Sequence, residues 1–200
     1  MKYFDIYKFN LNKIYKKHKM TYLKEKTIQT KTIHKGTFLT LNSDKVLLPN
    51  GNTSTREWIK HPGAVCCIPI LPDGKIGLIK QYRYAVKEQM IEIPAGKLDQ
   101  NEIPEECALR ELEEEIGYRA NQLTLLANIH PAIGFTDEKI WLYLAEELTE
   151  TAQALEASEV LTLQRVPAED VFTMAENGEI SDGKSVCALL RARAALAQRG

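Results

Sequence analysis

Alternating apolar and polar residues over the first half of the chain predict a succession of β-strands. Residues 21–49 contain alternating and β-branched side chains with a break at Gly36, which is typical of two or three strands joined by turns. The apolar run AVCCIPIL, the turn PDG and the run KIGLIKQYR follow, and this order predicts a β-hairpin. A short strand is expected over residues 90–94, MIEIP.

Helical periodicity appears in the middle of the chain and at its end. The segment PEECALRELEEEI, residues 104–116, has proline in its first turn, Leu109, Leu112 and Ile116 on one stripe, and glycine just past its end. Further strands are expected at 123–130, 139–145 and 160–166, a polar loop at 146–158, and helices at 168–177 and 185–198. This mixture of strands and helices predicts an α/β (α+β) fold.

The first 19 residues differ from the rest, because they contain six lysines, one aspartate and several aromatic residues without a helical stripe. We interpret residues 1–19 as a basic N-terminal extension. Three interpretations of it stay open: an arm for an anionic partner, a disordered terminus, or a segment upstream of a working start at Met20. Residues 20–60 are expected to form an N-terminal antiparallel β subdomain, and residues 61–200 the main domain.

Composition and charge narrow the class of protein. The 200 residues include 26 basic and 27 acidic side chains and are 44% apolar, which is typical of one globular domain. The net charge of -1 argues against a globally basic nucleic-acid-binding protein. The apolar runs are too short for a membrane span, the start does not resemble a signal peptide, and the cysteines form no C-x-x-C pair. We therefore expect a cytoplasmic protein without a membrane partner.

The helix expected at residues 104–116 carries an unusual excess of negative charge. Seven glutamates and a single cation, Arg110, lie between residues 102 and 115. Three of these glutamates fall in the last turn, where negative charge is disfavoured by roughly 0.3 to 1 kcal/mol each. Glu111 and Glu115 are four residues apart, and Glu114 flanks them on the same side of the helix. Either a solvated acidic face or a bound hard divalent cation would explain the arrangement.

The spacing of the charged residues distinguishes between these two explanations. The pattern G-x5-E-x7-R-E-U-x-E-E-x-G-U, in which U is a bulky aliphatic residue, is matched by Gly96, Glu102, Arg110, Glu111, Glu114, Glu115 and Gly117. Leu112 occupies the first U position, and Tyr118 at the second is a mild departure. This pattern resembles the Nudix box. The resemblance implies a Nudix fold, with a mixed β-sheet sandwiched between helices, and hydrolysis of a nucleoside diphosphate linked to another group.

The resemblance to the Nudix family also implies roles for the residues of the box. The positions that match metal ligands are Glu111, Glu115 and the backbone carbonyl of Ala95. Glu114 matches either a further ligand or a carboxylate that holds the catalytic water. Arg110 and Glu102 match a pair that orients these glutamates. The implied cofactor is Mg2+, with Mn2+ as an alternative, and it would neutralise the diphosphate and lower the pKa of the attacking water.

Segments outside the box resemble the ADP-ribose pyrophosphatases within that family. They are TREWIKHPGAV, QYR, EIPAGK, GFTDE and GEISDGKS, and the similarity spans residues 27–196. By this resemblance, Arg56 and Glu57 contact the substrate partly across a homodimer interface to which residues 20–60 contribute, and Arg83 holds a phosphate. The other positions that match substrate-binding residues are Thr37, Phe38, Lys97, Ala132, Gly134 and Glu138. Phe38 would stack on the adenine, although a place in the core explains this residue equally well.

The chain departs from the pyrophosphatase pattern in two places. Ala132 and Ile133 stand where Ser-Pro is usual before Gly134. By the resemblance, this change would alter contacts to the terminal ribose or shift the substrate preference. Many relatives also carry Glu-x-Glu before the strand expected at residue 160, the first as general base and the second as metal ligand. In the sequence LEASEV, Glu159 matches that ligand, but Ala157 stands at the position of the base.

Two other carboxylates are alternatives for the missing general base. Glu156 lies one residue before Ala157, and Glu138 ends the GFTDE segment. A carboxylate near a metal-bound water needs little pKa adjustment to accept a proton, so either residue fits the role.

The leading hypothesis is therefore a Mg2+-dependent hydrolase that splits ADP-ribose into AMP and ribose 5-phosphate. Hydrolysis of other nucleotide sugars, such as ADP-glucose or GDP-mannose, stays open because of the change at Ala132 and Ile133. A Nudix module that binds ADP-ribose without cleaving it is suggested by Ala157. A pure binding module, however, has no reason to tolerate the mutual repulsion of three glutamates in one helical turn.

Overall fold

A computed structural model describes residues 23–198, so the basic extension expected at residues 1–19 lies outside the described residues. In chain order the described elements are β1 (Lys26–Lys35), β2 (Thr40–Leu47), β3 (Thr53–Lys60), β4 (Ala64–Pro69), β5 (Ile76–Arg83), β6 (Glu88–Glu92), β7 (Ala95–Lys97), α2 (Pro104–Ile116), β8 (Tyr118–Ile129), β9 (Ile140–Glu150), β10 (Leu161–Val166), α3 (Ala168–Asn177) and α4 (Gly183–Leu196). No helix within residues 23–198 is long and apolar enough to cross a membrane.

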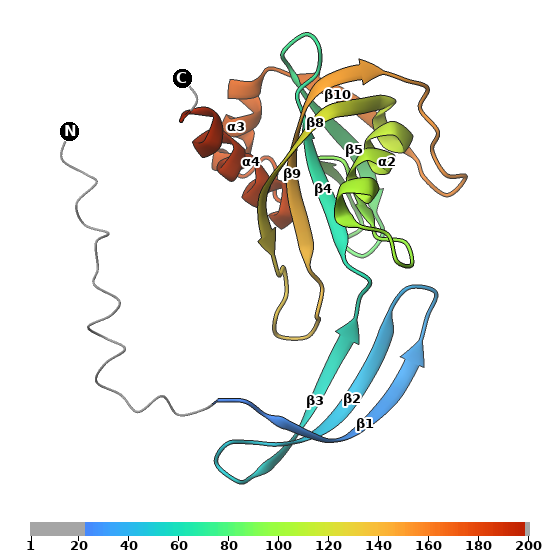
Figure 1. The fold of residues 1–200 in the computed structure, drawn as a ribbon, viewed down its shortest axis with the longest axis vertical. Coiled ribbons are helices and arrows are strands. Elements are labelled where there is room, and N and C mark those ends of the chain that lie inside the picture. The colour runs from blue at the N-terminus through green and yellow to red at the C-terminus, as the bar shows by residue number, and fades with distance from the viewer. Residues whose placement is uncertain (1–22, 199–200) are drawn as a thin grey trace, which may run out of the picture.

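The described strands form three sheets. The orders are β1-β2-β3, β10-β5-β6 and β7-β4-β9-β8. The last sheet is mixed, because β4 runs parallel to β9 and antiparallel to β7. Figure 1 shows α2 on one side of this sheet and α3 with α4 on the other, which confirms the predicted fold class.

β4 of the mixed sheet is apolar along its whole length, because helices cover both faces of this sheet. Ala64, Cys66 and Ile68 of β4 belong to a core cluster with residues of α3 and α4. The alternate residues Val65 and Cys67 belong to a second cluster with residues of α2. A strand that is covered on both faces needs apolar side chains at every position, and all six residues of β4 are buried.

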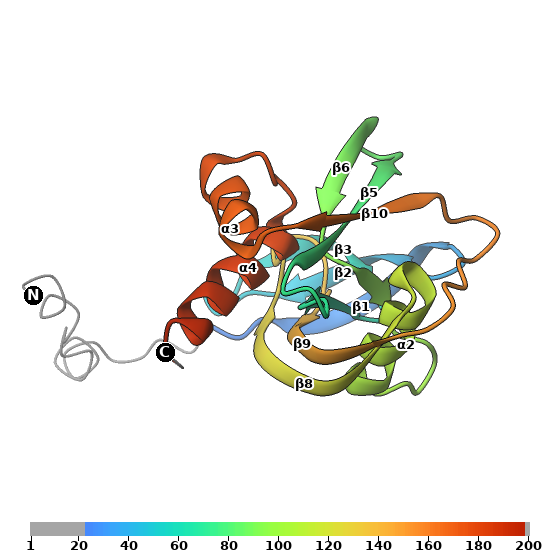
Figure 2. The ribbon, with the colours of Figure 1, turned by 90° about the horizontal axis from the view of Figure 1, so that it is seen from above.

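The hairpin expected from the AVCCIPIL and KIGLIKQYR runs is wrong beyond its turn. Gly74 donates its N–H to the carbonyl of Leu71, and one antiparallel bridge joins Ile70 to Ile76. Beyond this bridge β5 pairs with β6 and β10, and Figure 2 shows β5 and β6 projecting away from β8 and β9. The two strands separate because β7 and β9 already pair with both edges of β4.

Two segments with polar sequences pair as strands, and one of them lies partly in an expected loop. The loop expected at residues 146–158 begins later, because β9 continues to Glu150 and pairs there with Tyr118 at the start of β8. β3, which ends with the TREWIK segment, pairs with β2 along its full length. In both cases the pairing partner supplies hydrogen bonds that the local sequence does not signal.

The β1-β2-β3 sheet lies to one side of the mixed sheet and its helices (Figure 1). All ten residues of β1 are exposed. At its far end β3 is attached to the loop between β8 and β9, since Ile59 donates to the carbonyl of Phe135 and accepts a hydrogen bond from the N–H of Asp137. The GFTDE segment is thereby held beside the start of β4.

Candidate active site

Helix α2 brings the carboxylates of the box to one place. It spans residues 104–116 as predicted, and it ends at Gly117, whose φ of 69° lies in the left-handed region that glycine adopts without strain. Cys107, Ala108 and Leu112 anchor the helix in the core. Glu111 and Glu115 are buried on the same side of the helix as these apolar residues, and Glu115 faces the backbone of β7.

The backbone of β7 lies against these glutamates. The amide of Ala95 donates to a carboxylate oxygen of Glu115 at 2.9 Å. A Cβ atom at Gly96 would lie only 1.8 Å from the carboxyl group of Glu111, so no larger residue fits without moving that side chain. The glycine that begins the box therefore makes room for a carboxylate of α2.

Arg110 holds four other groups of the site in fixed positions. Its Nε and Nη2 donate to both oxygens of Glu102 at 2.8 and 3.0 Å, and these bonds lower the pKa of Glu102 to about 2. Its Nη1 donates to Glu111 at 2.8 Å and to Glu114 at 2.9 Å. Nη2 also reaches the carbonyl of Lys97 at 3.2 Å. This one cation orients two of the expected metal ligands through charge-assisted hydrogen bonds.

Arg110 does not neutralise the acidic cluster of α2. Burial, together with the charges of Glu111 and Glu159, raises the pKa of Glu115 to about 8, although the amide of Ala95 opposes the shift. Burial also raises the pKa of Glu111, despite its bond to Arg110. Removing carboxylates from water disfavours their charged form unless a cation balances them, and a divalent ion would supply that charge.

The acidic residues line a cavity of about 200 Å³, which we call the acidic cavity. Its walls are Gln81, Arg83, Ala95, Gly96, Lys97, Asp99, Arg110, Glu111, Glu114, Glu115, Glu156 and Glu159. Glu156 and Glu159 come from the loop between β9 and β10, where the amide of Glu156 donates to Glu159 at 3.2 Å. Glu102 lies behind this wall, bonded to Arg110.

The oxygen atoms that line the acidic cavity suit a hard divalent cation, which prefers carboxylate and carbonyl oxygens as ligands. Within residues 23–198, no three acidic, histidine or cysteine side chains are grouped in a geometry that holds a metal ion. The Nη1 of Arg110 is bonded to one oxygen of Glu111 and one of Glu114.

A larger cavity of about 530 Å³ adjoins the acidic cavity. The two share Arg83, Ala95, Gly96 and Lys97, and the larger cavity also includes Phe38, His61, Ala64, Pro131, Glu138, Ile140, Asp182, Gly183 and Lys184. The half-exposed ring of Phe38 meets His61 edge to face, with centroids 5.9 Å apart, and the Nζ of Lys97 lies 5.2 Å from the Phe38 ring. The larger cavity thus combines the aromatic ring of Phe38 with charged side chains such as Arg83 and Lys97.

The two alternatives for the general base lie in different cavities. Glu156 lines the acidic cavity with Glu111, Glu114 and Glu115. Glu138 lines the larger cavity, where its carboxylate is 3.7 Å from the Nε2 of His61.

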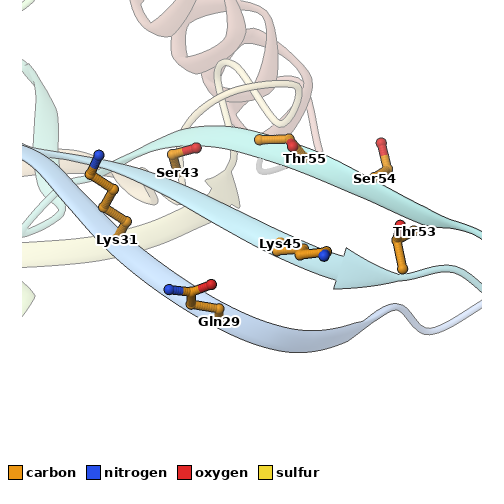
Figure 3. Close-up of a pocket in the computed structure, with 7 residues that line it drawn as sticks. All are labelled: Gln29, Lys31, Ser43, Lys45, Thr53, Ser54 and Thr55. Carbon is orange, nitrogen blue, oxygen red and sulfur yellow. The ribbon is translucent and has the colours of Figure 1, made fainter.

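Five of the expected substrate-binding residues line neither the acidic nor the larger cavity: Thr37, Arg56, Glu57, Ala132 and Gly134. Arg56 instead forms a two-point ion pair with Glu25, at 3.0 and 2.6 Å. A further cavity of about 300 Å³ lies on the β1-β2-β3 sheet and contains none of the expected site residues (Figure 3). Its lining is Gln29, Lys31, Ser43, Lys45, Thr53, Ser54 and Thr55.

Sequence reasoning missed several residues of the larger cavity. His61 and Lys184 line it, and Glu92 lies behind it, bound to Arg83 and Lys184. Each of the three belongs to a segment with the pyrophosphatase resemblance. Glu92 and Lys184 are 92 residues apart, however, so no local spacing could have paired them.

Comparisons with known proteins agree with this geometry. The NUDIX domain model matches residues 60–189, and the model of the nucleoside diphosphate sugar hydrolase N-terminal domain matches residues 25–59. The chain is 42% identical over 172 residues to the ADP-ribose pyrophosphatase of Bacillus subtilis, covering 85% of this chain and 93% of that protein. It is also 42% identical over 167 residues to the methanol dehydrogenase activator of Bacillus methanolicus, covering 82% and 90%.

A solved structure agrees as well. The crystal structure of an ADP compounds hydrolase superposes with a TM-score of 0.79 at 25% sequence identity, covering 88% of this chain and 96% of that one. Since the domain model spans more than half of the chain and the same fold carries its acidic box into one cavity, this protein belongs to the Nudix hydrolase family.

Proposed function

We propose that the protein hydrolyses ADP-ribose to AMP and ribose 5-phosphate in a Mg2+-dependent reaction. The observation that carries this proposal is the junction of the two cavities at Arg83 and the 95–97 segment. A diphosphate across this junction would meet carboxylates on one side, while its nucleoside and ribose would extend into a space with an aromatic wall. The pyrophosphatase of Bacillus subtilis, at 42% identity over most of both chains, supports this substrate.

The metal would be held by Glu111, Glu114, Glu115, Glu159 and the carbonyl of Ala95, with Mn2+ as an alternative to Mg2+. When bound, the ion would neutralise diphosphate oxygens and lower the pKa of the attacking water. Arg110 and Glu102 keep the glutamates of α2 oriented, and Arg83 offers a planar fork of N–H groups that suits phosphate oxygens.

Glu156 is our first choice for the general base, with Glu138 as the alternative. Glu156 shares the acidic cavity with the proposed ligands, so a water held among those ligands lies in the cavity that it lines. Glu138 lines the larger cavity and would need the water to approach from there.

We further propose that the protein acts as a homodimer in the cytoplasm. Arg56 and Glu57 lie on the exposed β1-β2-β3 sheet, outside the two joined cavities, so they would contact a substrate only if a second subunit brought them to it. All four cysteines are free, which is consistent with a reducing compartment.

A panel of nucleoside diphosphate sugars, assayed with and without Mg2+ for release of nucleotide and phosphosugar, tests this function. We expect ADP-ribose to be cleaved with the highest kcat/KM and only when the metal is present. Equal turnover of ADP-glucose or GDP-mannose would favour the broader nucleotide-sugar hydrolase that the Ala132-Ile133 departure leaves open. Binding of ADP-ribose without turnover of any member would favour a non-catalytic module.

A further inference from the structure

Arg83 lies where the two cavities meet, and its side chain is bonded to a residue other than the one with which it pairs in the sheet. It is the last residue of β5, and its register partner on β6 is the exposed Glu88. Its side chain instead turns inward to Glu92, to which Nε and Nη2 donate at 2.6 and 2.7 Å. A guanidinium has five N–H groups, so this pair of bonds engages only two of them.

Glu92 is an unusual partner for an arginine that lines two cavities. It is only 1% exposed, whereas the Arg83 side chain is 43% exposed. Burying a carboxylate is costly unless cations and hydrogen bonds compensate for the lost water, and a buried ion pair is weak evidence of a stabilising role. The position of Glu92 is better explained by its effect on the direction of the arginine.

A second cation completes the surroundings of Glu92. The Nζ of Lys184 donates to the Glu92 oxygen that also accepts from Arg83 Nη2, and it donates to Asp182 at 2.9 Å. Asp182 also caps α4, since it accepts from the amide of Ser185 at 3.0 Å. The cluster of Arg83, Lys184, Glu92 and Asp182 thus has two charges of each sign, and its Lys184 and Asp182 come from the beginning of α4.

The C-terminal helix is tied to β6 and β7 at the same place. The hydroxyl of Ser185 accepts a hydrogen bond from the amide of Ile93, the residue after Glu92, at 3.0 Å. Ser185 and Ile93 are both fully buried. Glu92 is therefore held by backbone as well as side-chain contacts, so it is a rigid anchor for the arginine.

We propose that Glu92 and Lys184 are positioning residues that hold Arg83 at the junction of the cavities, with its remaining N–H groups directed at the diphosphate of the substrate. The role rests on the proposed function. Neither residue needs to touch the phosphates: Glu92 acts through Arg83, and Lys184 acts through Glu92. Because Arg83 is already oriented in the free enzyme, substrate binding does not have to order this long side chain. Losing that orientation should therefore weaken substrate binding more than it lowers turnover.

Steady-state kinetics with ADP-ribose and Mg2+ separates this role from a merely structural one. We expect Glu92→Gln to raise KM about 10- to 100-fold with kcat changed less than about threefold. Lys184→Met should raise KM by a smaller factor, about three- to tenfold, and Lys184→Arg should restore KM to within about twofold because it keeps a cation beside Glu92. Loss of folded enzyme alone would lower the apparent kcat and leave KM unchanged.

A double-mutant cycle tests whether Glu92 acts through Arg83. In an Arg83→Gln background, Glu92→Gln should raise KM no further. Glu176→Gln is the matched control, since it removes an ion-pair partner of Arg193 and lines neither joined cavity, and it should leave KM unchanged.

Several outcomes would overturn the positioning role. One is a KM for Glu92→Gln within twofold of the parent value. Another is a full effect of Glu92→Gln on KM in the Arg83→Gln background. If Glu92→Gln does not fold, equal KM values for Lys184→Met and Lys184→Arg would overturn the role. A parent enzyme that does not cleave ADP-ribose would contradict the proposed function instead. Calorimetric titration with ADP-ribose and Mg2+ would then test the positioning role by affinity, with weaker binding by Glu92→Gln in its favour and equal binding against it.

Discussion

Glu115 and Glu92 are both almost completely buried, at 3% and 1% exposure, yet their pKa values move in opposite directions. Burial and two neighbouring carboxylates raise the pKa of Glu115 to about 8, and a backbone amide is its hydrogen-bond donor. Burial would also raise the pKa of Glu92, but the bonds from Arg83 and the charge of Lys184 lower it below its ordinary value.

This difference separates two uses of a buried carboxylate. The Glu92 cluster has balanced charges and is complete within the chain, so it fixes the direction of a neighbouring side chain. The acidic cavity has six carboxylates in its lining against three cations, Arg83, Lys97 and Arg110, so its negative charge is in excess. Excess charge of this kind is costly in the protein alone and becomes favourable when a divalent cation binds.

The largest effect is expected when a proposed metal ligand is neutralised. Glu115→Gln should lower kcat/KM for ADP-ribose about a thousandfold, because it removes a charged ligand and leaves the shape of the site unchanged. Enzyme assays at saturating Mg2+ measure this loss. Glu113→Gln is the control on the same helix, since Glu113 is partly exposed and pairs only loosely with Arg119, at 3.5 Å. Similar activities for the two variants would remove the metal-site interpretation.

A smaller but still large effect is expected at the general base. Glu156→Gln should lower kcat about a hundredfold, while Glu138→Gln should change it less than about tenfold. The pH dependence of kcat in both variants measures the effect, because loss of the base removes the acidic limb of the profile. The reverse order would assign the base to Glu138 in the larger cavity, and negligible effects from both would place the base elsewhere.

The stability of the metal-free protein should respond in opposite ways at the two buried glutamates. Glu92→Gln leaves Arg83 and Lys184 without their shared anion, and it should lower the free energy of unfolding by about 1–3 kcal/mol, since Arg83 is partly solvated. Glu115→Gln replaces a carboxyl group whose charged form is disfavoured by burial, so it should leave that free energy unchanged or raise it. Urea unfolding in the presence of a chelator measures the free energy of unfolding of both variants. Equal losses of this free energy would contradict the difference between the two environments.

The smallest effect is a pH dependence of stability. The pKa of Glu115 in the folded protein, about 8, lies above its ordinary value of 4.5, so the folded state binds more protons than the unfolded state between these values. The metal-free protein should therefore lose stability as pH rises from about 5 to 9, which thermal unfolding measures. Glu115→Gln should flatten this slope, as should saturating Mg2+, and a parent protein that gains stability over this range would contradict the assignment.

Local sequence was sufficient for the helix of the site and for its chemistry. Residues 104–116 form α2 as expected, because the apolar stripe, the proline of the first turn and Gly117 all act within a few turns of one helix. The residues of the box span 96 to 117, so their spacing alone predicted that the glutamates would gather. The shared acidic cavity agrees with that expectation, although metal binding itself stays a prediction.

Long-range contacts decided what local sequence could not. The strands on either side of the PDG turn enter different sheets, because β7 and β9 occupy the edges of β4. Glu156 and Glu138 were equal alternatives in the sequence, and the loops that carry them bring them to different cavities. Glu92 and Lys184 have no common motif, and only the hydrogen bonds between the start of α4 and the end of β6 with the residue that follows it join them.

The sequence by itself determined the family, the acidic helix and the kind of ion that its carboxylates suit, because helical periodicity and box spacing are local properties. Tertiary structure alone decided that the two cavities meet at Arg83 and how the side chain of Arg83 is held there. The physical reason is that a buried charge is stable only beside partners that satisfy it, and those partners come from strands and helices far apart in the chain.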